Sequence, residues 1–420
     1  MSGPILWKAR YSVMSILVMA FLVSSMDKIA ISVALPYIAE DMHLSPVEMG
    51  SVMSAFFLSY SISQIPGGLL ADKLGVRKVA TVAMIWWSTF TGLTGATTSI
   101  MQLVSSRFLF GLGEGLFPAC AFKTIATWFP KRERATANSV MFAANFLGTA
   151  IAPLLVVVII SLWSWRQVFY VLFIPGFIVV LLFWRFIPNH PSEKAGITDT
   201  ELAEILDGDD GQPKQSSDRL VSVLFNPIVV KYFLVVFTFD LAYWGFASWL
   251  PTYLVQARGL SMVQMGVFAS LPAFAGTVGC VIAGWMSDRF FSERRRMPII
   301  VAELCAAVFL YLTFSATSTV ALVIFQTLSG FALMFFFGVF WALPMNSVPA
   351  RNMGLTGSFI NMAGQLAAVV APLVIGFLVH LSGGHFGTTF TFLIASLLVS
   401  SGLVLTLPSK WGQRNEGALA

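Results

Sequence analysis

The amino-acid sequence predicts an all-α membrane protein: twelve transmembrane helices in two six-helix bundles that are related by a parallel repeat. Its composition is the first indication, because 57% of the 420 residues are hydrophobic and only 11% are charged, whereas soluble domains contain about 25% charged residues. Apolar runs of about 20 residues, long enough to cross the hydrocarbon core, alternate with short polar connections. Motifs shared by the two halves are the third indication. The runs start near positions 12, 49, 80, 102, 139, 168, 229, 263, 298, 320, 355 and 388.

The basic residues follow the orientation rule for membrane proteins. Most of the 25 Lys and Arg residues fall on one side of the predicted spans, and Arg166 and Arg258 fall on the other. Because short cytoplasmic loops carry the excess of Lys and Arg, we expect both termini in the cytoplasm. The net charge of +5 then reflects orientation, and we expect no nucleic-acid partner. The expected location is the cell inner (plasma) membrane, as a multi-pass protein surrounded by lipid.

A long polar stretch divides the chain into two halves. It runs from about Pro188 to Asn226 and is rich in charged residues, which is typical of a linker between two bundles. Six predicted spans precede it and six follow it. We expect an N-terminal bundle over residues 1–187, a cytoplasmic linker over residues 188–226 with one amphipathic turn at 199–206, and a C-terminal bundle over residues 227–420.

The second half repeats motifs of the first. Asn145, Gly148 and the Ala-Pro-Leu triplet at 152–154 recur as Asn361, Gly364 and the Ala-Pro-Leu triplet at 371–373. Repeats in the same orientation are found in transporters whose two bundles rock about a site near the midplane of the membrane.

No residue pattern indicates a metal, a cofactor or an enzyme. Cys120, Cys280 and Cys305 lie within predicted helices, and the four histidines lie in connections without the spacing of metal ligands. No nucleophile and base are paired within a predicted span. We therefore expect no cofactor and no enzymatic activity.

A glycine-containing basic loop follows the second predicted span. Its pattern, Gly68-x-x-x-Asp72-Lys73-x-Gly75-x-Arg77, resembles the cytoplasmic signature loop of the major facilitator superfamily. The resemblance implies a gating loop, in which the glycines allow a tight turn. Asp72 would pair with a base or with a helix N-terminus and so latch one conformation. The alternative is a plain basic loop on the cytoplasmic side.

Five ionisable residues lie at membrane depth, away from the ends of otherwise apolar predicted helices: Asp27, Lys28, Arg107, Glu114 and Asp240. Each costs about 2.5–3.5 kcal/mol at the centre of a spanning helix, so each should face a partner or a wet cavity. Arg107 and Glu114 are two helical turns apart and share one face, whereas Asp27 and Lys28 are adjacent and point about 100° apart. Asp27 and Lys28 therefore cannot face the same point.

Three longer motifs narrow the resemblance. They are Tyr60-x-x-x-Gln64-Ile65-Pro66-Gly67-Gly68, Arg107-Phe108-x-x-Gly111-x-x-Glu114 and Trp128-Phe129-Pro130-x-x-Glu133-Arg134. They are similar to motifs of the anion:cation symporter family. Its bacterial members take up sugar acids (galactonate, glucarate, hexuronates), tartrate or aromatic acids with protons, and its animal relatives carry glutamate, phosphate or sialic acid. The sugar-acid branch resembles this chain most.

The burial cost and the resemblance together suggest a role for each charged residue. Lys28 would bind the substrate carboxylate, and Glu114 would carry the proton. Asp27 would couple to Glu114 or neutralise a nearby base, and Arg107 would be a structural charge partner. The family usually carries Asp-Arg where this chain has Asp27 and Lys28, and Lys lacks the planar fork of Arg. A static salt-bridge cluster is the alternative interpretation.

Asp240 matches no carboxylate of the family pattern. It is expected to be a structural charge partner, with a second proton site or an acceptor for a substrate hydroxyl as the alternatives.

Uncharged polar residues complete the expected substrate site: Tyr60, Gln64, Asn145, Trp341 and Asn361. Asn and Gln both donate and accept hydrogen bonds to hydroxyls, and aromatic rings pack on a sugar face. The alternative is that these residues only bond neighbouring helices.

The predicted function is proton-coupled symport of a small organic anion by alternating access, with a sugar acid such as galactonate, glucarate or a hexuronate as the substrate. The expected partners are this anion, protons and membrane lipid, and a monomer is the expected functional unit. An aromatic-acid or other carboxylate symporter is the first alternative. A drug:proton antiporter and a membrane sensor that has lost transport are the others.

Overall fold

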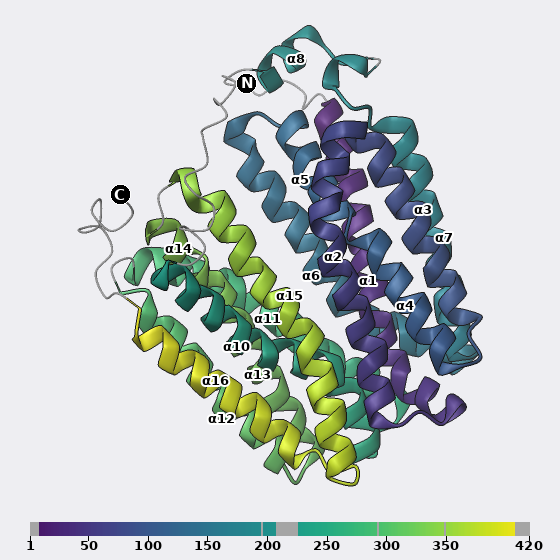
Figure 1. Cartoon of the computed structure of the whole chain (residues 1–420), viewed down its shortest axis with the longest axis vertical. Helices are drawn as coiled ribbons and strands as arrows, with labels where there is room; N and C mark the ends of the chain where they lie inside the picture. The colour runs from purple at the N-terminus through teal and green to yellow at the C-terminus, as the bar shows by residue number, and fades with distance from the viewer. Residues whose placement is uncertain (1–7, 195, 207–225, 292–293, 348–349, 408–420) are drawn as a thin grey trace. The chain divides into compact units, whose positions relative to one another are not determined.

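The computed structural model describes residues 8–194, 196–206, 226–291, 294–347 and 350–407, and this part of the chain is helical (Figure 1). The chain divides into two compact units, Met1–His43 with Ala55–Pro213, and Leu44–Ser54 with Lys214–Ala420. Part of the expected linker, residues 207–225, lies outside the described residues.

The helices follow the chain in the order of the predicted apolar runs. Before the linker they are α1 (Ala9–Met42), α2 (Pro46–Leu74), α3 (Val76–Gly95), α4 (Ile100–Glu114), α5 (Phe117–Trp128), α6 (Lys131–Leu162), α7 (Trp165–Phe186), the 3₁₀ turn η1 (Pro191–Glu193) and α8 (Asp199–Leu206). After it they are α10 (Pro227–Thr252), the π-helical segment η2 (Tyr253–Ala257), α11 (Met262–Phe290), α12 (Arg296–Ser315), α13 (Thr319–Phe340), α14 (Ala342–Ser347), α15 (Ala350–Leu381) and α16 (Gly387–Leu405).

Ten helical segments of the described chain are long and apolar enough to cross a membrane. Helices α2 and α3 are not among them, although the sequence predicts a span at each. Serines and glycines recur along α2, whose last turn contains Asp72 and Lys73, and threonines recur along α3. These two helices are therefore less apolar than the other ten segments.

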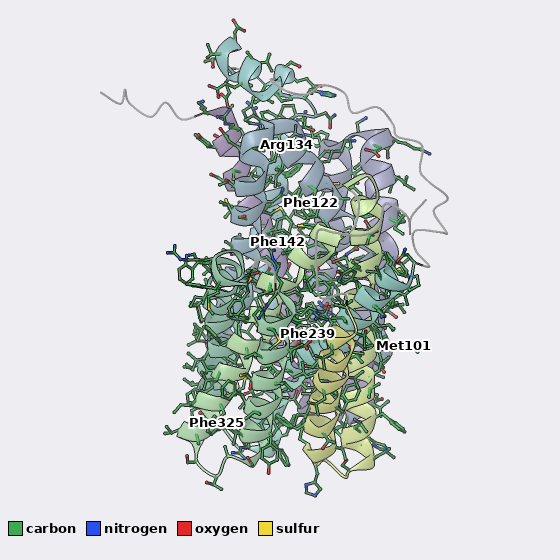
Figure 2. All side chains as sticks on the ribbon, turned by 90° about the vertical axis from the view of Figure 1, so that its left-hand side faces the viewer. Met101, Phe122, Arg134, Phe142, Phe239 and Phe325 are labelled. Carbon is green, nitrogen blue, oxygen red and sulfur yellow. The ribbon has the colours of Figure 1, made fainter. Side chains whose placement is uncertain are left out.

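Apolar side chains cover much of the helix surface (Figure 2). Met101 is 73% exposed, and the exposed rings of Phe122 on α5 and Phe142 on α6 contact each other with their centroids 6.1 Å apart. Phe239 on α10 is buried instead and stacks on Phe336 of α13 at 3.7 Å. Large exposed apolar surface of this kind is suited to a lipid environment and not to water.

Two of the predicted spans are broken. The fourth divides into α4 and α5 at Gly115 and Leu116, and the tenth divides into α13 and α14 at Trp341. In both, a proline follows the break: Pro118 and Pro344 have no backbone N–H to donate to the carbonyl four residues earlier. The apolar pattern of the sequence predicts an uninterrupted span at each of these places, so the breaks differ from that expectation. Discontinuous helices are typical of the substrate sites of transporters.

The same helix pair packs closely in each unit. Helix α1 packs along α6, and α10 packs along α15. A Cβ at Gly148 of α6 would lie 2.6 Å from the carbonyl oxygen of Leu22 and 2.9 Å from Cβ of Ser25, so only glycine permits this approach of α6 to α1. Gly364, the repeat counterpart of Gly148, occupies the same kind of position between α15 and α10.

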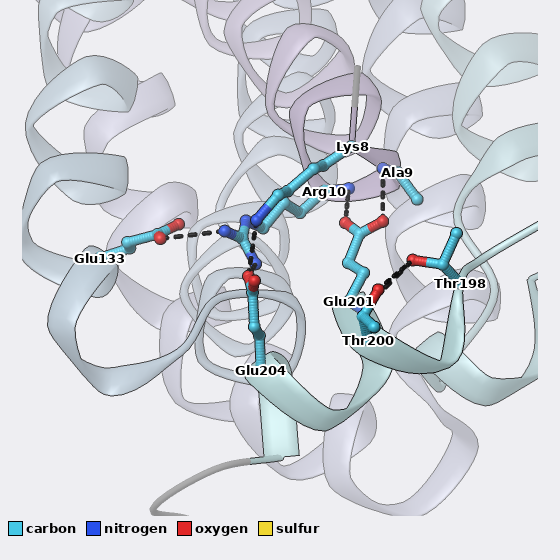
Figure 3. Close-up of polar contacts among 8 residues, drawn as sticks. All are labelled: Lys8, Ala9, Arg10, Glu133, Thr198, Thr200, Glu201 and Glu204. Atoms are coloured by element: carbon cyan, nitrogen blue, oxygen red, sulfur yellow. Dashed lines mark hydrogen bonds and ion pairs between the residues drawn. The ribbon is translucent and has the colours of Figure 1, made fainter. Parts of the chain in front are cut away.

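The linker helix α8 caps the start of α1 (Figure 3). The Glu201 carboxylate accepts the backbone N–H groups of Ala9 and Arg10, each at 3.0 Å. These N–H groups have no partner within the helix, and a carboxylate there also favours the positive end of the helix dipole. The amphipathic turn expected at residues 199–206 is thus a helix that caps a segment almost two hundred residues earlier in the chain.

The side chain of Arg10 joins three helices beside this cap. It is 1% exposed and donates to Glu204 of α8 at 2.9 Å and to Glu133 of α6 at 3.0 Å, while Lys8 also contacts Glu204 at 2.7 Å (Figure 3). We call Lys8, Arg10, Glu133, Glu201 and Glu204 the α8 clamp. It ties α1 and α6 together at the end where the linker leaves the unit.

The α8 clamp should be sensitive to acid. Hydrogen bonds from Lys8 and then Arg10 hold the pKa of Glu204 below its ordinary value, so this stabilisation is present at neutral pH and is lost as the pH falls through the lowered pKa. Glu204→Gln should therefore reduce the free energy of unfolding at neutral pH by about 0.2–1 kcal/mol, as for other partly exposed pairs. Thermal unfolding of the detergent-purified protein measures it.

The control is Glu193→Gln, which changes an exposed carboxylate before α8. The difference between wild type and Glu204→Gln should vanish once the wild-type carboxyl is protonated. An undiminished difference in acid would contradict the assignment of the effect to charge.

Candidate functional site

Lys28 of α1 and Glu114 of α4 form an ion pair inside the first unit. The Lys28 Nζ lies 3.0 Å from Glu114 Oε1, and the side chains are 20% and 1% exposed. Ser24, one turn before Lys28, donates to the same Oε1 at 2.5 Å. The second oxygen, Oε2, is buried and has no hydrogen-bond partner among the residues that the structure describes. The α4–α5 break follows Glu114 directly, so the carboxylate lies at the end of a half-helix.

Asp27 points away from this pair. It is buried, and its Oδ2 accepts a hydrogen bond from Thr91 of α3 at 3.3 Å, while Oδ1 has no partner. Adjacent residues on a helix point about 100° apart, and here one of them faces α4 and the other faces α3. The two helix-one charges therefore contact different helices.

Arg107 is fully buried between aromatic rings. Its guanidinium carbon lies 4.3 Å from the ring centroid of Phe110 and 5.3 Å from that of Phe56. None of its three side-chain nitrogens has a hydrogen-bond partner in the described part of the chain. Asp27 and Glu114 are both within electrostatic reach of it, so its charge is balanced through space and by the π-systems.

The four residues Asp27, Lys28, Arg107 and Glu114 therefore form one group, which we call the charge cluster. It contains two acids and two bases, and its formal charge is zero when all four are ionised. The sequence predicted that Asp27 couples to Glu114 or neutralises a nearby base, and the structure places all four residues within one unit.

Three of the expected uncharged residues belong to the same unit as the charge cluster. The Lys28 ammonium sits over the Tyr60 ring, 5.2 Å from its centroid. Gln64 follows one turn later on α2 and is partly exposed. On α6, Asn145 Oδ1 accepts a hydrogen bond from Ser25 at 2.5 Å.

The other expected site residues belong to the second unit. Trp341 lies at the α13–α14 break and contacts the ring of Phe340, while Asn361 is exposed on α15. Asp240 is buried on α10. No charged partner of Asp240 is found among the described residues, so the structural ion pair expected there has no observed counterpart.

The expected gating loop forms contacts within its own unit. Asp72 pairs with Lys123 of α5 at 2.6 Å, and the same ammonium donates to the Ala71 carbonyl at 2.9 Å. Lys73 is exposed. The pair joins the end of α2 to the half-helix that follows Glu114.

Gly75 and Arg77 contact the end of α7 and the segment that follows it. Gly75 has φ of 84°, a left-handed conformation that glycine adopts without strain. The Asn189 side chain accepts the Arg77 N–H at 3.0 Å, and the Arg77 guanidinium donates to the Trp184 carbonyl at 2.7 Å and stacks over the Trp184 ring.

Sequence reasoning missed the residues that hold the charges. Ser24 and Thr91 are small polar residues of a common type, and only the helical spacing of Ser24 and Lys28, four residues apart, signals that they share a face. Phe56 and Phe110 were not distinguished from the many other phenylalanines. Among the described residues, no group of three or more His, Cys, Asp or Glu could hold a metal ion, and the three cysteines are free.

Comparison with known sequences gives a family match. Residues 17–372 match the Major Facilitator Superfamily. The chain is 32% identical over 410 residues to the probable sulfoacetate transporter SauU of Cupriavidus necator, covering 95% of this chain and 94% of that protein. It is 31% identical over 399 residues to the probable galactarate/D-glucarate transporter GarP of Escherichia coli, covering 88% of each. It is 29% identical to the hexuronate transporter of Bacillus subtilis, covering 92% of each.

Solved structures have the same fold. A bacterial homologue of the human lysosomal transporter Spinster, in an inward-facing and occupied conformation, aligns with a TM-score of 0.80 and 18% identity over 99% of this chain and 100% of that chain. A D-xylose–proton symporter aligns with a TM-score of 0.74 and 16% identity, covering 95% and 98% of the two chains.

The two glycines of the loop make a matched pair for mutation. Gly75→Ala should destabilise the protein by about 1–2 kcal/mol, because an L-residue is strained at this φ and its Cβ would lie 2.7 Å from the Asn189 side chain. At Gly68 the nearest atom to an added Cβ is 3.9 Å away, so Gly68→Ala should be tolerated. Thermal unfolding measures both variants, and equal effects would contradict this account.

Proposed function

Because the chain belongs to the Major Facilitator Superfamily, whose members are transporters and not enzymes, we propose that it is a secondary active symporter that takes up a small organic anion together with protons. The proposed substrate is a sugar acid such as galactonate, glucarate or a hexuronate. The relatives are named as transporters or probable transporters of organic acids, which supports an organic-acid substrate, and the charge cluster supports the coupling to protons.

The ion pair between Lys28 and Glu114 is the observation that carries the proposal. A substrate carboxylate needs a cation, and Lys28 is the partly exposed base of the cluster. Its ammonium is already occupied by Glu114, so the two carboxylates compete for one base. Protonation of Glu114 removes this competition and frees Lys28 for the anion. Proton binding and anion binding then favour each other.

The geometry of Glu114 suits this exchange. Oε1 holds the contacts to Lys28 and Ser24, whereas Oε2 has no partner, so a proton can bind at Oε2 without displacing a donor. Asp27 couples to this step through Arg107, which lies within electrostatic reach of both acids. When one acid is neutralised, the other remains to balance the arginine.

The charge balance of the cluster explains why uptake of an anion would be coupled to uptake of a proton. The empty charge cluster has a formal charge of zero, a bound anion adds one negative charge, and one proton restores zero. Carrying one uncompensated charge against an inside-negative potential costs about 2.3 kcal/mol per 100 mV. Electroneutral entry of a monoanion therefore needs one proton.

The proposed cycle is alternating access of two six-helix bundles, residues 1–187 and 227–420, joined by the linker at 188–226. This proposal includes twelve spans, cytoplasmic termini, a monomer surrounded by lipid and an inner-membrane location. The gating loop, with Gly68, Asp72, Lys73, Gly75 and Arg77, would latch one conformation on the cytoplasmic side. The broken helices α4–α5 and α13–α14 support a site at mid-depth, as in other transporters.

The proposed substrate site adds uncharged groups to Lys28. They are Tyr60, Gln64 and Asn145 of the first unit and Trp341 and Asn361 of the second. Amides that both donate and accept suit a chain of hydroxyls, which favours sugar acids over aromatic acids. A drug:proton antiporter is disfavoured because Lys28 would repel a cationic drug.

Glu114→Gln tests the coupling directly. The amide is neutral and mimics the protonated acid, so the variant should bind the anion and exchange labelled for unlabelled substrate in proteoliposomes. It should not accumulate substrate when an inward proton gradient is imposed. Uptake and counterflow of a radiolabelled sugar acid measure the two activities.

Glu303→Gln is the matched control, because Glu303 is also buried in a predicted span but is bonded to Ser400 and Ser401 in the second unit. It should retain accumulation. Gradient-driven accumulation by Glu114→Gln at the wild-type level would refute the assignment.

A further inference from the structure

Asp240 is a buried acid that the charge cluster does not use. It lies near the middle of α10 with 4% of its surface exposed, and its Oδ1 is buried without a hydrogen-bond partner. Among the described residues no charged group interacts with it. The phenol of Tyr243 on its own helix is within electrostatic reach of Asp240, and Tyr243 in turn interacts with the thiol of Cys280 on α11. Neither neighbour supplies a positive charge.

The carboxyl of Asp240 is pressed against the backbone of α15. A Cβ at Gly364 would collide with Oδ2 of Asp240 and lie 3.5 Å from its Cγ and 3.6 Å from the side chain of Val236. The absence of a side chain at Gly364 therefore makes the space that the carboxyl fills. Asn361, an expected substrate residue, is three residues before Gly364 and hence on the same side of α15.

The internal repeat relates the position of Asp240 to a residue of the first unit. Aligning Pro36 of α1 with Pro251 of α10, the proline within the first long helix of each half, places Asp240 at the position of Ser25. In the first unit Ser25 lies against Gly148 and donates to Asn145. Asp240 lies against the counterpart glycine, Gly364, which is about one helical turn from the counterpart asparagine on α15. A polar group therefore occupies this position in both halves, against the helix that carries an expected substrate residue.

An acid without a cation stays neutral here. Ionising it would leave an uncompensated charge in a desolvated site, which is far more costly than burying the neutral acid. This distinguishes Asp240 from Glu114, which has Lys28 beside it in the empty protein. It also argues against a proton carrier, because the empty carrier would have to return with the unpaired charge buried. A neutral carboxyl instead offers one O–H donor and one carbonyl acceptor.

We propose that Asp240 is a permanently protonated specificity residue, whose carboxyl hydrogen-bonds a hydroxyl of the substrate and so selects hydroxylated acids. The inference rests on the proposed function and narrows its substrate class to polyhydroxy carboxylates. Its physical basis is the unpaired Oδ1, because a buried polar group without a partner rejects a substrate that cannot bond to it. Asp240 therefore contributes to the choice of substrate and not to the proton count.

Paired substrates of equal length test the proposal. Glucarate and adipate are both six-carbon dicarboxylates, and only glucarate carries hydroxyls. Their uptake into proteoliposomes is measured together with the number of protons moved per substrate. Asp240→Leu should lower the glucarate-to-adipate ratio of kcat/KM by at least about tenfold, mainly through the KM for glucarate. Asp240→Asn keeps a donor and an acceptor in the same shape, so it should retain the preference and the proton count.

Two further variants complete the test. Glu303→Gln changes another buried acid of the second unit, whose oxygens are already bonded to Ser400 and Ser401, and should leave the ratio unchanged. Gly364→Ala should displace the Asp240 carboxyl and lower the ratio as Asp240→Leu does. It supplies the same measurement if Asp240→Leu does not fold.

Three results would overturn the proposal. Fewer protons moved per glucarate by Asp240→Asn would identify Asp240 as a proton carrier. Loss of transport in this neutral variant would refute permanent protonation. An equal loss for glucarate and adipate in Asp240→Leu, or an unchanged ratio, would leave Asp240 only a structural role. Failure of the wild-type protein to take up any organic acid would refute the proposed function instead.

Discussion

The need to compensate charge in a low-dielectric interior governs this structure. Lys28 and Glu114 meet at 3.0 Å in the first unit, and Asp27 and Arg107 complete a group of two acids and two bases. No member of such a group can be neutralised or removed without leaving another unbalanced. The group is therefore stable only in a few charge states. In the proposed function this property provides the coupling, because an anion would enter the charge cluster only together with a proton.

The backbone around the charge cluster connects it to the expected gating loop. Helix α4 ends at Glu114, because the glycines around it and Pro118 interrupt the hydrogen-bond ladder. The half-helix α5 then carries Lys123 to Asp72 at the end of α2. One broken span thus links the buried acid to the expected gating loop. At the same end of the unit as this loop, the α8 clamp fixes the start of α1, the helix that carries Lys28.

Much of the helical framework could be predicted from the sequence, because apolar runs of spanning length and the cost of buried charge are strong signals. The same cost identified Lys28 and Glu114, and the helical angle between neighbours predicted that Asp27 and Lys28 would face different helices. The contacts that hold them could not be predicted. Ser24 and Thr91 belong to common residue types, and their roles follow from how α1, α3 and α4 pack. The α8 clamp was also missed, because its carboxylates and their partners are far apart in the chain. The unpaired state of Asp240 could be recognised only once its neighbours were known.

The number of protons taken up when the anion binds tests the central claim most directly. It is obtained from titration calorimetry of the purified protein with a monoanionic hexuronate in buffers of different ionisation enthalpy, since the dependence of the heat on the buffer gives the protons bound. The account predicts about one proton taken up per anion bound by the wild-type protein, because Glu114 must release Lys28, and none by Glu114→Gln. Binding to the wild-type protein without proton uptake would contradict the account.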